Sequence, residues 1–215
     1  MRPLLITDCD EVLVHMVRHF RTWLGDTHGI DFALDAHDFH AAMTRRDGGP
    51  KPSQEEMWGY LGGFFPAEMA RQTLVPGAAE ALARFDEEAD IVILTNLQDQ
   101  CRQARIDQLA AFGIEHRVVC NQGGKGQPVA ALVAEYKPSV AVFVDDLGVH
   151  HDSVARHAPD VHRLHMIAEP QLARVMPPAP YAHARIDDWA DAADWIADRF
   201  ASGEPAHQPT LEETA

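Results

Sequence analysis

The sequence predicts an α/β fold, a doubly wound parallel sheet with a small helical insertion. Apolar runs at residues 4–6, 91–94 and 140–144 are continuous rather than alternating, as is typical of parallel strands covered on both faces. Amphipathic patterns of helical period lie between these runs. Polar residues directly follow each run, and the carboxyl edge of such a sheet is where ligands bind.

The length and charge of the chain exclude several classes of partner. At 215 residues, the chain can form one core domain plus an insertion. Its 18 basic and 33 acidic residues give a formal net charge of −15, which repels nucleic-acid backbones and anionic membranes. Three cysteines without metal-ligand spacing, no signal-peptide pattern and no membrane-spanning apolar run indicate a cytoplasmic protein. We expect no nucleic-acid or membrane partner, and the oligomeric state is not predicted.

Two acids follow the first predicted strand. Asp8 and Asp10 lie one residue apart, so an extended chain turns both carboxylates to the same side, where they repel each other unless a cation lies between them. Magnesium is the expected cation, because it is hard, prefers oxygen ligands and is satisfied by few carboxylates. The same pair would equally suit a helix N-terminus, since Asp is a good capping residue and favours the positive end of the helix dipole.

Residues 15–74 are predicted to form helices and loops inserted after the first strand. A helical apolar pattern opens this segment. Ser53, with an acid three residues later, forms a capping-box signature before another helix, and a basic loop at residues 45–52 precedes it. Asp35 is expected to cap a helix that contains Phe39, Ala42 and Met43.

Residues 75–201 are predicted to complete the core that begins with residues 1–14. Residues 202–215 have almost no apolar content, so we expect them to be disordered. The predicted strands cover residues 90–94, 117–120 and 140–144, with a weaker one near 161–167. The predicted helices cover residues 78–88, 98–112, 149–157 and 187–200, and a further helix begins at Pro128.

Polar side chains follow four of the predicted strands, and we expect them to meet at one edge of the sheet. Lys125, one of only three lysines, lies in a Gly-Gly-Lys-Gly turn, where its ammonium would suit a phosphoryl group. Taken singly, the other pairs would also suit an ordinary turn or a helix cap. The full set is Asp8 and Asp10, Thr95 and Asn96, Lys125, and Asp145 and Asp146.

With these residues, the chain resembles the haloacid dehalogenase-like hydrolase superfamily, whose members are mostly magnesium-dependent phosphatases with a Rossmann-like core. Glu11 and Val12 stand where Gly and Thr often stand in the family's first motif, so the resemblance does not indicate a subfamily. Four motifs in the family's order, between Leu4 and about Asp152, carry the resemblance: Asp8-Cys9-Asp10-Glu11-Val12-Leu13, Ile91-Val92-Ile93-Leu94-Thr95-Asn96, Lys125, and Val142-Phe143-Val144-Asp145-Asp146.

The resemblance implies catalytic roles for residues of the first three motifs. Asp8 would be the nucleophile and would form an aspartyl-phosphate intermediate. Asp10 would be the general acid and base, first protonating the leaving group and then taking a proton from water. Thr95, Asn96 and Lys125 would bind the phosphoryl group and stabilise its charge.

The resemblance also implies a Mg²⁺ cofactor. Its ligands would be the side chain of Asp8, the backbone carbonyl of Asp10 and the acid pair of the fourth motif. Asp146 is the favoured direct ligand, and Asp145 would bind directly or through water.

The insertion at residues 15–74 is similar in position to the helical cap of this family, which closes over the active site and excludes water. In that position, Arg45 and Arg46, together with Lys51, would recognise the part of an anionic substrate remote from the phosphate. They would equally serve as solubilising charges in an exposed loop.

These expectations combine into one favoured function and two alternatives. The favoured function is a magnesium-dependent phosphomonoesterase that acts on a small phosphorylated metabolite. A sugar-phosphate mutase would use the same residues. A catalytically silent binding or regulatory protein is the alternative of another class, since fold alone does not determine function.

Overall fold

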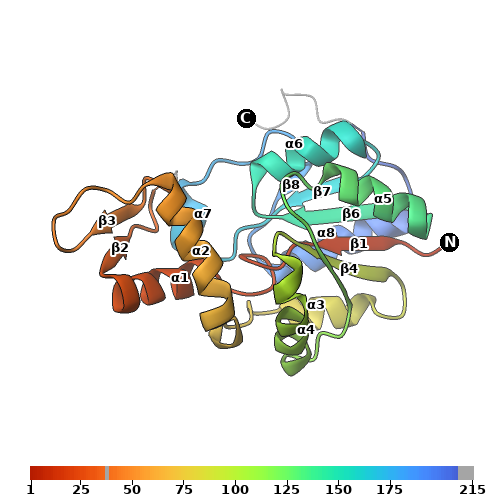
Figure 1. Cartoon of the computed structure of the whole chain (residues 1–215). Coiled ribbons are helices and arrows are strands. Elements are labelled where there is room, and N and C mark those ends of the chain that lie inside the picture. Colours follow the sequence, from red (N-terminus) through yellow and green to blue (C-terminus); the bar gives the residue numbers. More distant parts are fainter. Residues whose placement is uncertain (37–38, 208–215) are drawn as a thin grey trace.

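The computed structural model describes residues 1–36 and 39–207, which form two lobes (Figure 1). The core lobe contains the large sheet and its flanking helices, and the insertion lobe is built mainly from residues 15–74. No helix of these described residues combines the length and apolar composition needed to cross a membrane.

The core lobe is built on a six-stranded sheet in the order β5-β4-β1-β6-β7-β8, in which every neighbouring pair is parallel. After β1 the chain forms β4 and β5 on one side of it, and then returns to form β6, β7 and β8 on the other. This arrangement confirms the predicted doubly wound α/β fold; the short β8 was not predicted. The strands are β1 Leu4–Thr7, β4 Asp90–Thr95, β5 Arg117–Cys120, β6 Ala141–Asp145, β7 His162–His165 and β8 Ala184–Arg185.

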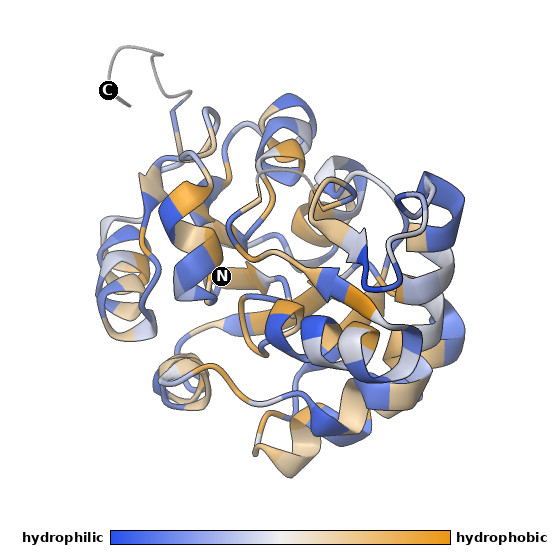
Figure 2. Cartoon of the chain, turned by 90° about the vertical axis from the view of Figure 1, so that its left-hand side faces the viewer, coloured by the Kyte–Doolittle hydropathy of each residue, from blue (hydrophilic) through white to orange (hydrophobic). Residues whose placement is uncertain are grey.

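Helices cover both faces of this sheet, which explains why the strand sequences are apolar without alternation. Leu5 and Ile93 pack with helices α3, α4 and α8 on one face, whereas Ile6 and Leu94 pack with α5 and α6 on the other. Figure 2 shows hydrophobic residues concentrated on the strands, while the helices carry both hydrophobic and hydrophilic residues. The helices are α3 Ala78–Phe85, α4 Arg102–Ala111 after the short 3₁₀ turn η3 Asp99–Cys101, α5 Gly126–Tyr136, α6 Gly148–His157 and α8 Trp189–Ser202.

The insertion lobe has its own hydrophobic core, centred on Phe20, which contacts four other aromatic rings. The capping box predicted at Ser53 is confirmed, because its side chain accepts from the backbone N–H of Glu56 and the Glu56 carboxylate accepts from that of Ser53. The elements of the insertion are α1 Val17–Trp23, the π-helical turn η1 Leu24–His28, β2 Ile30–Phe32, β3 Met43–Arg45, α2 Gln54–Glu68 and the 3₁₀ turn η2 Met69–Arg71.

The helix predicted after Asp35 is wrong, because Met43 belongs to β3 and the described residues between β2 and β3 form turns and irregular chain. Phe32 pairs with Met43, and both are buried, whereas Asp31 between Ile30 and Phe32 is exposed. This alternation has the period of a half-buried strand rather than a helix. Residues 37–38, inside the predicted helix, lie outside the described part of the chain.

Two segments late in the chain make contacts that the sequence did not predict. Helix α7, Pro170–Val175, lies beside the insertion lobe (Figure 1), and its Leu172 packs against the hydrophobic core of that lobe. In contrast to the disorder expected from residue 202, Ser202 ends α8 and the buried Ala206 donates its N–H to the carbonyl of Asp160. Residues 208–215 of the predicted tail lie outside the described residues.

Glu11 joins the core lobe to the start of the insertion. It is buried in the turn after β1 with a left-handed φ of 59°. Its carboxylate accepts from the backbone N–H groups of Met16 and Val17, at the start of α1, and from that of Glu169, before α7. An acid here therefore satisfies three backbone donors, which gives Glu11 a structural role at the position where the sequence departs from the commonest family motif.

Replacing Glu11 should destabilise the fold. Glu11→Ala leaves these backbone donors without the carboxylate, and we expect the free energy of unfolding, measured in urea, to fall by about 2–4 kcal/mol. Glu11→Gly loses the same bonds but adopts the left-handed φ without strain, so its loss should be smaller by about 0.5–1 kcal/mol. Loss of less than 0.5 kcal/mol in Glu11→Ala would contradict the structural role.

Candidate active site

The residues predicted to form a site meet at the carboxyl ends of β1, β4 and β6. In register, Thr7 of β1 lies opposite Ile93 of β4 on one side and Val144 of β6 on the other. Asp8 and Asp145, the next residues along, are therefore neighbours. The strand order reverses at β1, and in open α/β sheets this crevice is the position where ligands bind.

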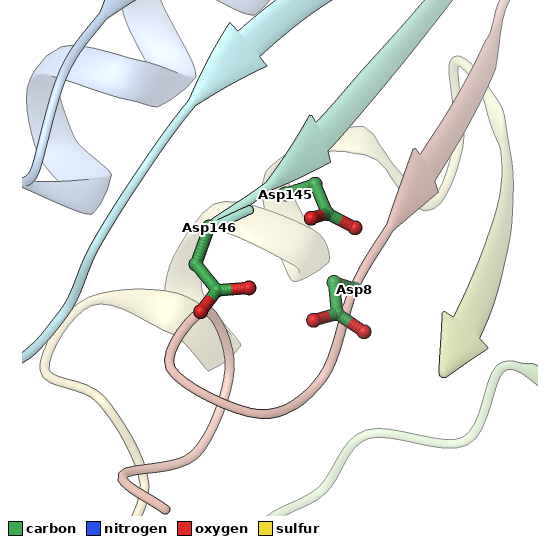
Figure 3. A group of neighbouring side chains, drawn as sticks. All are labelled: Asp8, Asp145 and Asp146. Atoms are coloured by element: carbon green, nitrogen blue, oxygen red, sulfur yellow. The ribbon is translucent and has the colours of Figure 1, made fainter. Parts of the chain in front are cut away.

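Three carboxylates converge at this position (Figure 3). Asp8 comes from the end of β1, and Asp145 and Asp146 come from the end of β6. One carboxylate oxygen from each lies within 4.8 Å of the other two. Three hard oxygen donors at this separation suit Mg²⁺, which binds few carboxylates and keeps its remaining positions for water or phosphate oxygens. The donor set therefore fits the metal that the sequence predicts.

Lys125 links two of these carboxylates. Its buried Nζ lies 2.6 Å from Asp8 Oδ1 and 2.6 Å from Asp145 Oδ2. The glycine-rich turn allows this approach, because a Cβ at Gly126 would lie 2.1 Å from the carbonyl oxygen of Ser153 in α6. The close contact of α5 with α6 at Gly126 brings the ammonium to the sheet edge.

One ammonium does not balance three carboxylates. Burial raises the pKa of Asp8 to about 7, although Lys125 opposes the shift. Burial and the charges of Asp145 and Asp8 raise the pKa of Asp146. Burial also disfavours the charge of Asp145, but the Lys125 ammonium beside it keeps the pKa of that carboxyl below its usual value. The folded site therefore crowds more carboxylate charge together than one ammonium can offset, and a divalent cation would relieve this crowding.

This excess charge should lower stability when no metal is bound. We expect Asp146→Asn to raise the Tm by about 2–5 °C in EDTA at pH 7.5, because it removes one of the crowded charges. A raised carboxyl pKa in the folded state stabilises the fold at low pH, and that stability is lost as pH rises. The gain in Tm should therefore be small at pH 4 and grow toward pH 7.5.

The matched control is Asp198→Asn, which removes a carboxylate exposed on α8. It should leave the Tm within 1 °C under the same conditions, as surface substitutions usually do. Added Mg²⁺ should raise the Tm of the wild type and of this control more than that of Asp146→Asn. A lower Tm for Asp146→Asn in EDTA at pH 7.5 would contradict the proposed charge imbalance.

The side chain of Asp10 lies outside this carboxylate cluster. Arg105 of α4 donates from Nη2 to both carboxylate oxygens, at 2.8 and 2.9 Å, and Gln72 donates from Nε2 at 3.1 Å. Arg105 is fully buried and also donates to Gln72 and Gln108 through Nη1. The metal ligand predicted from this residue is its backbone carbonyl and not this side chain, which Arg105 and Gln72 occupy.

Arg105 and Gln72 were not predicted as site residues. The sequence does contain a signal for Arg105, because it lies four residues after Cys101 and four before Leu109, on the buried face of α4. An arginine on an apolar helical stripe requires a buried partner. The identity of that partner, Asp10, depends on how α4 packs against β5 and η2 and was not indicated by spacing.

The end of β4 supplies two further predicted residues. The hydroxyl of Thr95 is buried and has no hydrogen-bond partner within the described part of the chain. Asn96 donates from Nδ2 to the carbonyl of Gly123, at 2.9 Å, and accepts from Asn121. Asn96 thus connects β4 to the turn that carries Lys125. Asn96 lines the cavity described next, whereas Thr95 lies behind its wall.

A cavity of about 370 Å³ opens in front of these groups. Asp8, Asp10, Lys125 and Asp146 line its core side, together with His150, whose role the sequence did not indicate. The opposite wall comes from the insertion lobe and consists of Met16, Trp58, Leu61, Gly62 and Phe65.

The predicted cationic residues of the insertion lie elsewhere. Arg45 is paired with Glu56, and Arg46 is paired with Asp31 and donates to the carbonyl of Gly25. Both arginines belong to the β2–β3 region at the far end of the insertion lobe (Figure 1). Neither lines the cavity, so the structure does not bring them to the site.

Comparisons with known proteins identify the fold. No protein-family model and no curated protein sequence matches the chain. Solved structures do match. A haloacid dehalogenase-like family hydrolase from Streptococcus pneumoniae has a TM-score of 0.61 at 11% identity, over 90% of this chain and 97% of that one.

Two further matches have descriptions that name an activity. A candidate beta-phosphoglucomutase from Thermotoga maritima has a TM-score of 0.60 at 14% identity, over 91% of this chain and 99% of that one. A predicted phosphoglycolate phosphatase from Haemophilus somnus has a TM-score of 0.58 at 17% identity, over 90% of this chain and 97% of that one. The chain therefore has the fold of the haloacid dehalogenase-like hydrolases.

Proposed function

We propose that this protein is a magnesium-dependent phosphomonoesterase that forms an aspartyl-phosphate intermediate on Asp8. The observation that carries the proposal is the position of Asp8. It lies in the wall of a cavity, with the Lys125 ammonium 2.6 Å away and with Asp145 and Asp146 converging beside it. A carboxylate nucleophile, a fixed positive charge and a metal-binding acid pair are the groups that phosphoryl transfer requires.

In the first step, an oxygen of Asp8 attacks phosphorus and the ester bond to the leaving group breaks. The Lys125 ammonium reduces the repulsion between the Asp8 carboxylate and the dianionic phosphate, and it stabilises the charge of the transferring group. The unpartnered Thr95 hydroxyl would donate to a non-bridging oxygen. Mg²⁺, held by Asp8 and Asp146, would supply further positive charge to the phosphoryl oxygens.

Asp10 would transfer the protons. It gives a proton to the leaving alkoxide in the first step, and in the second it takes one from the water that attacks the aspartyl-phosphate, which restores Asp8. Arg105 Nη2 donates to both oxygens of this carboxylate and so holds it in place.

The insertion at residues 15–74 would act as the cap of this site. Its α2 supplies Trp58, Leu61 and Phe65 to the wall that faces the carboxylates, a position from which it can limit the access of water. A cavity of about 370 Å³ suits a small phosphorylated metabolite rather than a phosphoprotein. The net charge of −15 and the free cysteines support a cytoplasmic enzyme without nucleic-acid partners.

Hydrolysis of phenyl phosphate by the purified protein tests this proposal. We expect turnover that requires Mg²⁺ and is lost in EDTA. Asp8→Asn should lower kcat by about 10³-fold or more, because it removes the nucleophile, and Asp198→Asn should retain full activity. Trapping a phosphorylated protein that is absent in Asp8→Asn would support the intermediate. Full activity in Asp8→Asn would contradict the nucleophile assignment.

A further inference from the structure

Apolar side chains from both lobes form most of the cavity wall beyond the carboxylates, and the uncharged amides of Asn96, Gln98 and Gln122 form the rest of its core side with Cys101 and His150. Met16, Trp58, Leu61 and Phe65 come from the insertion lobe, and Leu97 and Leu147 come from the core lobe. Trp58 is 61% exposed although it is one of the largest apolar side chains, so its ring is available for contact. An aromatic face in an apolar wall suits a flat or hydrocarbon group, which gains by leaving water.

The same wall offers no free positive charge to a second anion. Lys125 is the one lysine or arginine among the cavity-lining residues that the structure describes, and it already pairs with Asp8 and Asp145. Burial lowers the pKa of His150, so that residue is neutral at pH 7. Arg45 and Arg46 are engaged in ion pairs outside the cavity. A carboxylate or second phosphate on the substrate would lose its hydration here without gaining a cation.

We infer that the substrates are phosphate monoesters of uncharged apolar alcohols or phenols, foremost those with an aromatic ring. This inference rests on the proposed function and narrows it. The phosphate lies against Asp8, Lys125 and the metal ligands, and the leaving group lies against Trp58 and Phe65. Esters that carry a carboxylate, such as phosphoglycolate, are rejected because their second charge has no partner.

Paired substrates and paired variants test the inference. We expect kcat/KM for benzyl phosphate to exceed that for phosphoglycolate by at least about tenfold. Trp58→Ala should raise the KM for benzyl phosphate several-fold and leave that for phosphoglycolate nearly unchanged, whereas Trp58→Phe should retain most of the preference. Tyr181→Ala, which removes an exposed ring that does not line the cavity, is the matched control. A selective loss of phosphoglycolate turnover in Arg46→Ala would overturn the inference.

Binding of stable analogues separates this inference from the proposed reaction. With Mg²⁺ present, calorimetry should show benzylphosphonate binding at least about tenfold more tightly than phosphonoacetate. If this preference holds but neither ester is hydrolysed, the proposed phosphatase reaction fails and the ligand class stands. If phosphonoacetate binds as tightly, or neither phosphonate binds at millimolar concentration, the ligand class is wrong even if some phosphate ester is hydrolysed.

A second inference comes independently from the buried ion pair of Asp10. Arg105 projects from α4 of the core lobe, and Gln72 lies just after η2, where the chain leaves the insertion lobe. Both donate to Oδ1 of Asp10, and Gln72 also accepts from Arg105 Nη1 at 3.1 Å. Gln108 then connects this group to the carbonyl of Met69. The position of Asp10 is thus set from both lobes at once.

We propose that Arg105 and Gln72 are positioning residues that act on the reaction through Asp10. Neither lines the cavity, so neither is expected to touch the substrate. A misplaced Asp10 delivers its proton poorly, and that loss is greatest for leaving groups that depart only when protonated. Alkyl and benzyl esters need this proton, whereas 4-nitrophenolate departs without it.

The dependence on leaving group distinguishes this role from a structural one. We expect Gln72→Met to slow the release of benzyl alcohol within a single turnover about tenfold or more, with KM changed less than twofold and the release of 4-nitrophenol within a single turnover slowed less than threefold. Arg105→Met should have a larger effect of the same kind, and Arg105→Lys should restore part of it. Equal slowing of this first step for both esters in Gln72→Met, which remains informative if the Arg105 variants do not fold, would overturn the proposal.

Discussion

The active-site geometry depends on one buried ammonium. Lys125 lies between Asp8 and Asp145, so it joins the ends of β1 and β6 to the turn after β5. A fully buried lysine is stable only when its charge is paired, and here two carboxylates pair it. The sheet order places both acids at the edge that the lysine reaches. The strand order therefore brings the two acids to Lys125, and the two acids in turn make the burial of its charge possible.

One ammonium does not offset the charge of three carboxylates. This imbalance connects the geometry of the site to the binding of a cation. Lys125 lies 2.6 Å from a carboxylate oxygen of Asp8 and of Asp145, yet burial still raises the pKa of Asp8. Burial and the two neighbouring acids raise the pKa of Asp146 as well. A site arranged in this way would bind a cation at the cost of metal-free stability. Such a compromise is common where a protein must bind charge in a partly buried position.

Sequence patterns were sufficient to predict the parts of the site that depend on single strands. Asp8, Thr95 and Asp145 each follow a continuous apolar run, and parallel strands bring their carboxyl ends to one edge whatever the details of packing. Lys125 was predictable for a similar reason, since its glycine-rich turn begins next to that edge. Placing these residues at one edge requires only that their strands are parallel and lie near one another in the sheet.

The features that were missed depend on packing between elements. The pairing of Arg105 with Asp10 requires the orientation of α4 against β5 and η2. The apolar part of the cavity wall requires the position of α2 relative to the sheet. Arg45 and Arg46 looked suited to anion recognition because charge is visible in a sequence, whereas their partners Glu56 and Asp31 become neighbours only through the β2–β3 pairing. The wrong helix after Asp35 has a different cause. Short strands and short helices both contain apolar residues at spacings of two to four, so the apolar period does not distinguish them there.

Glu11 combines a local backbone conformation with contacts between distant elements. It lies four residues after the end of β1, in a left-handed turn, and its carboxylate holds the starts of α1 and α7. The turn begins one residue after Asp10, so the same short segment carries the two acids proposed for catalysis and anchors the insertion lobe. A change in the position of that lobe would act on Asp10 from two directions, through Glu11 and through Gln72.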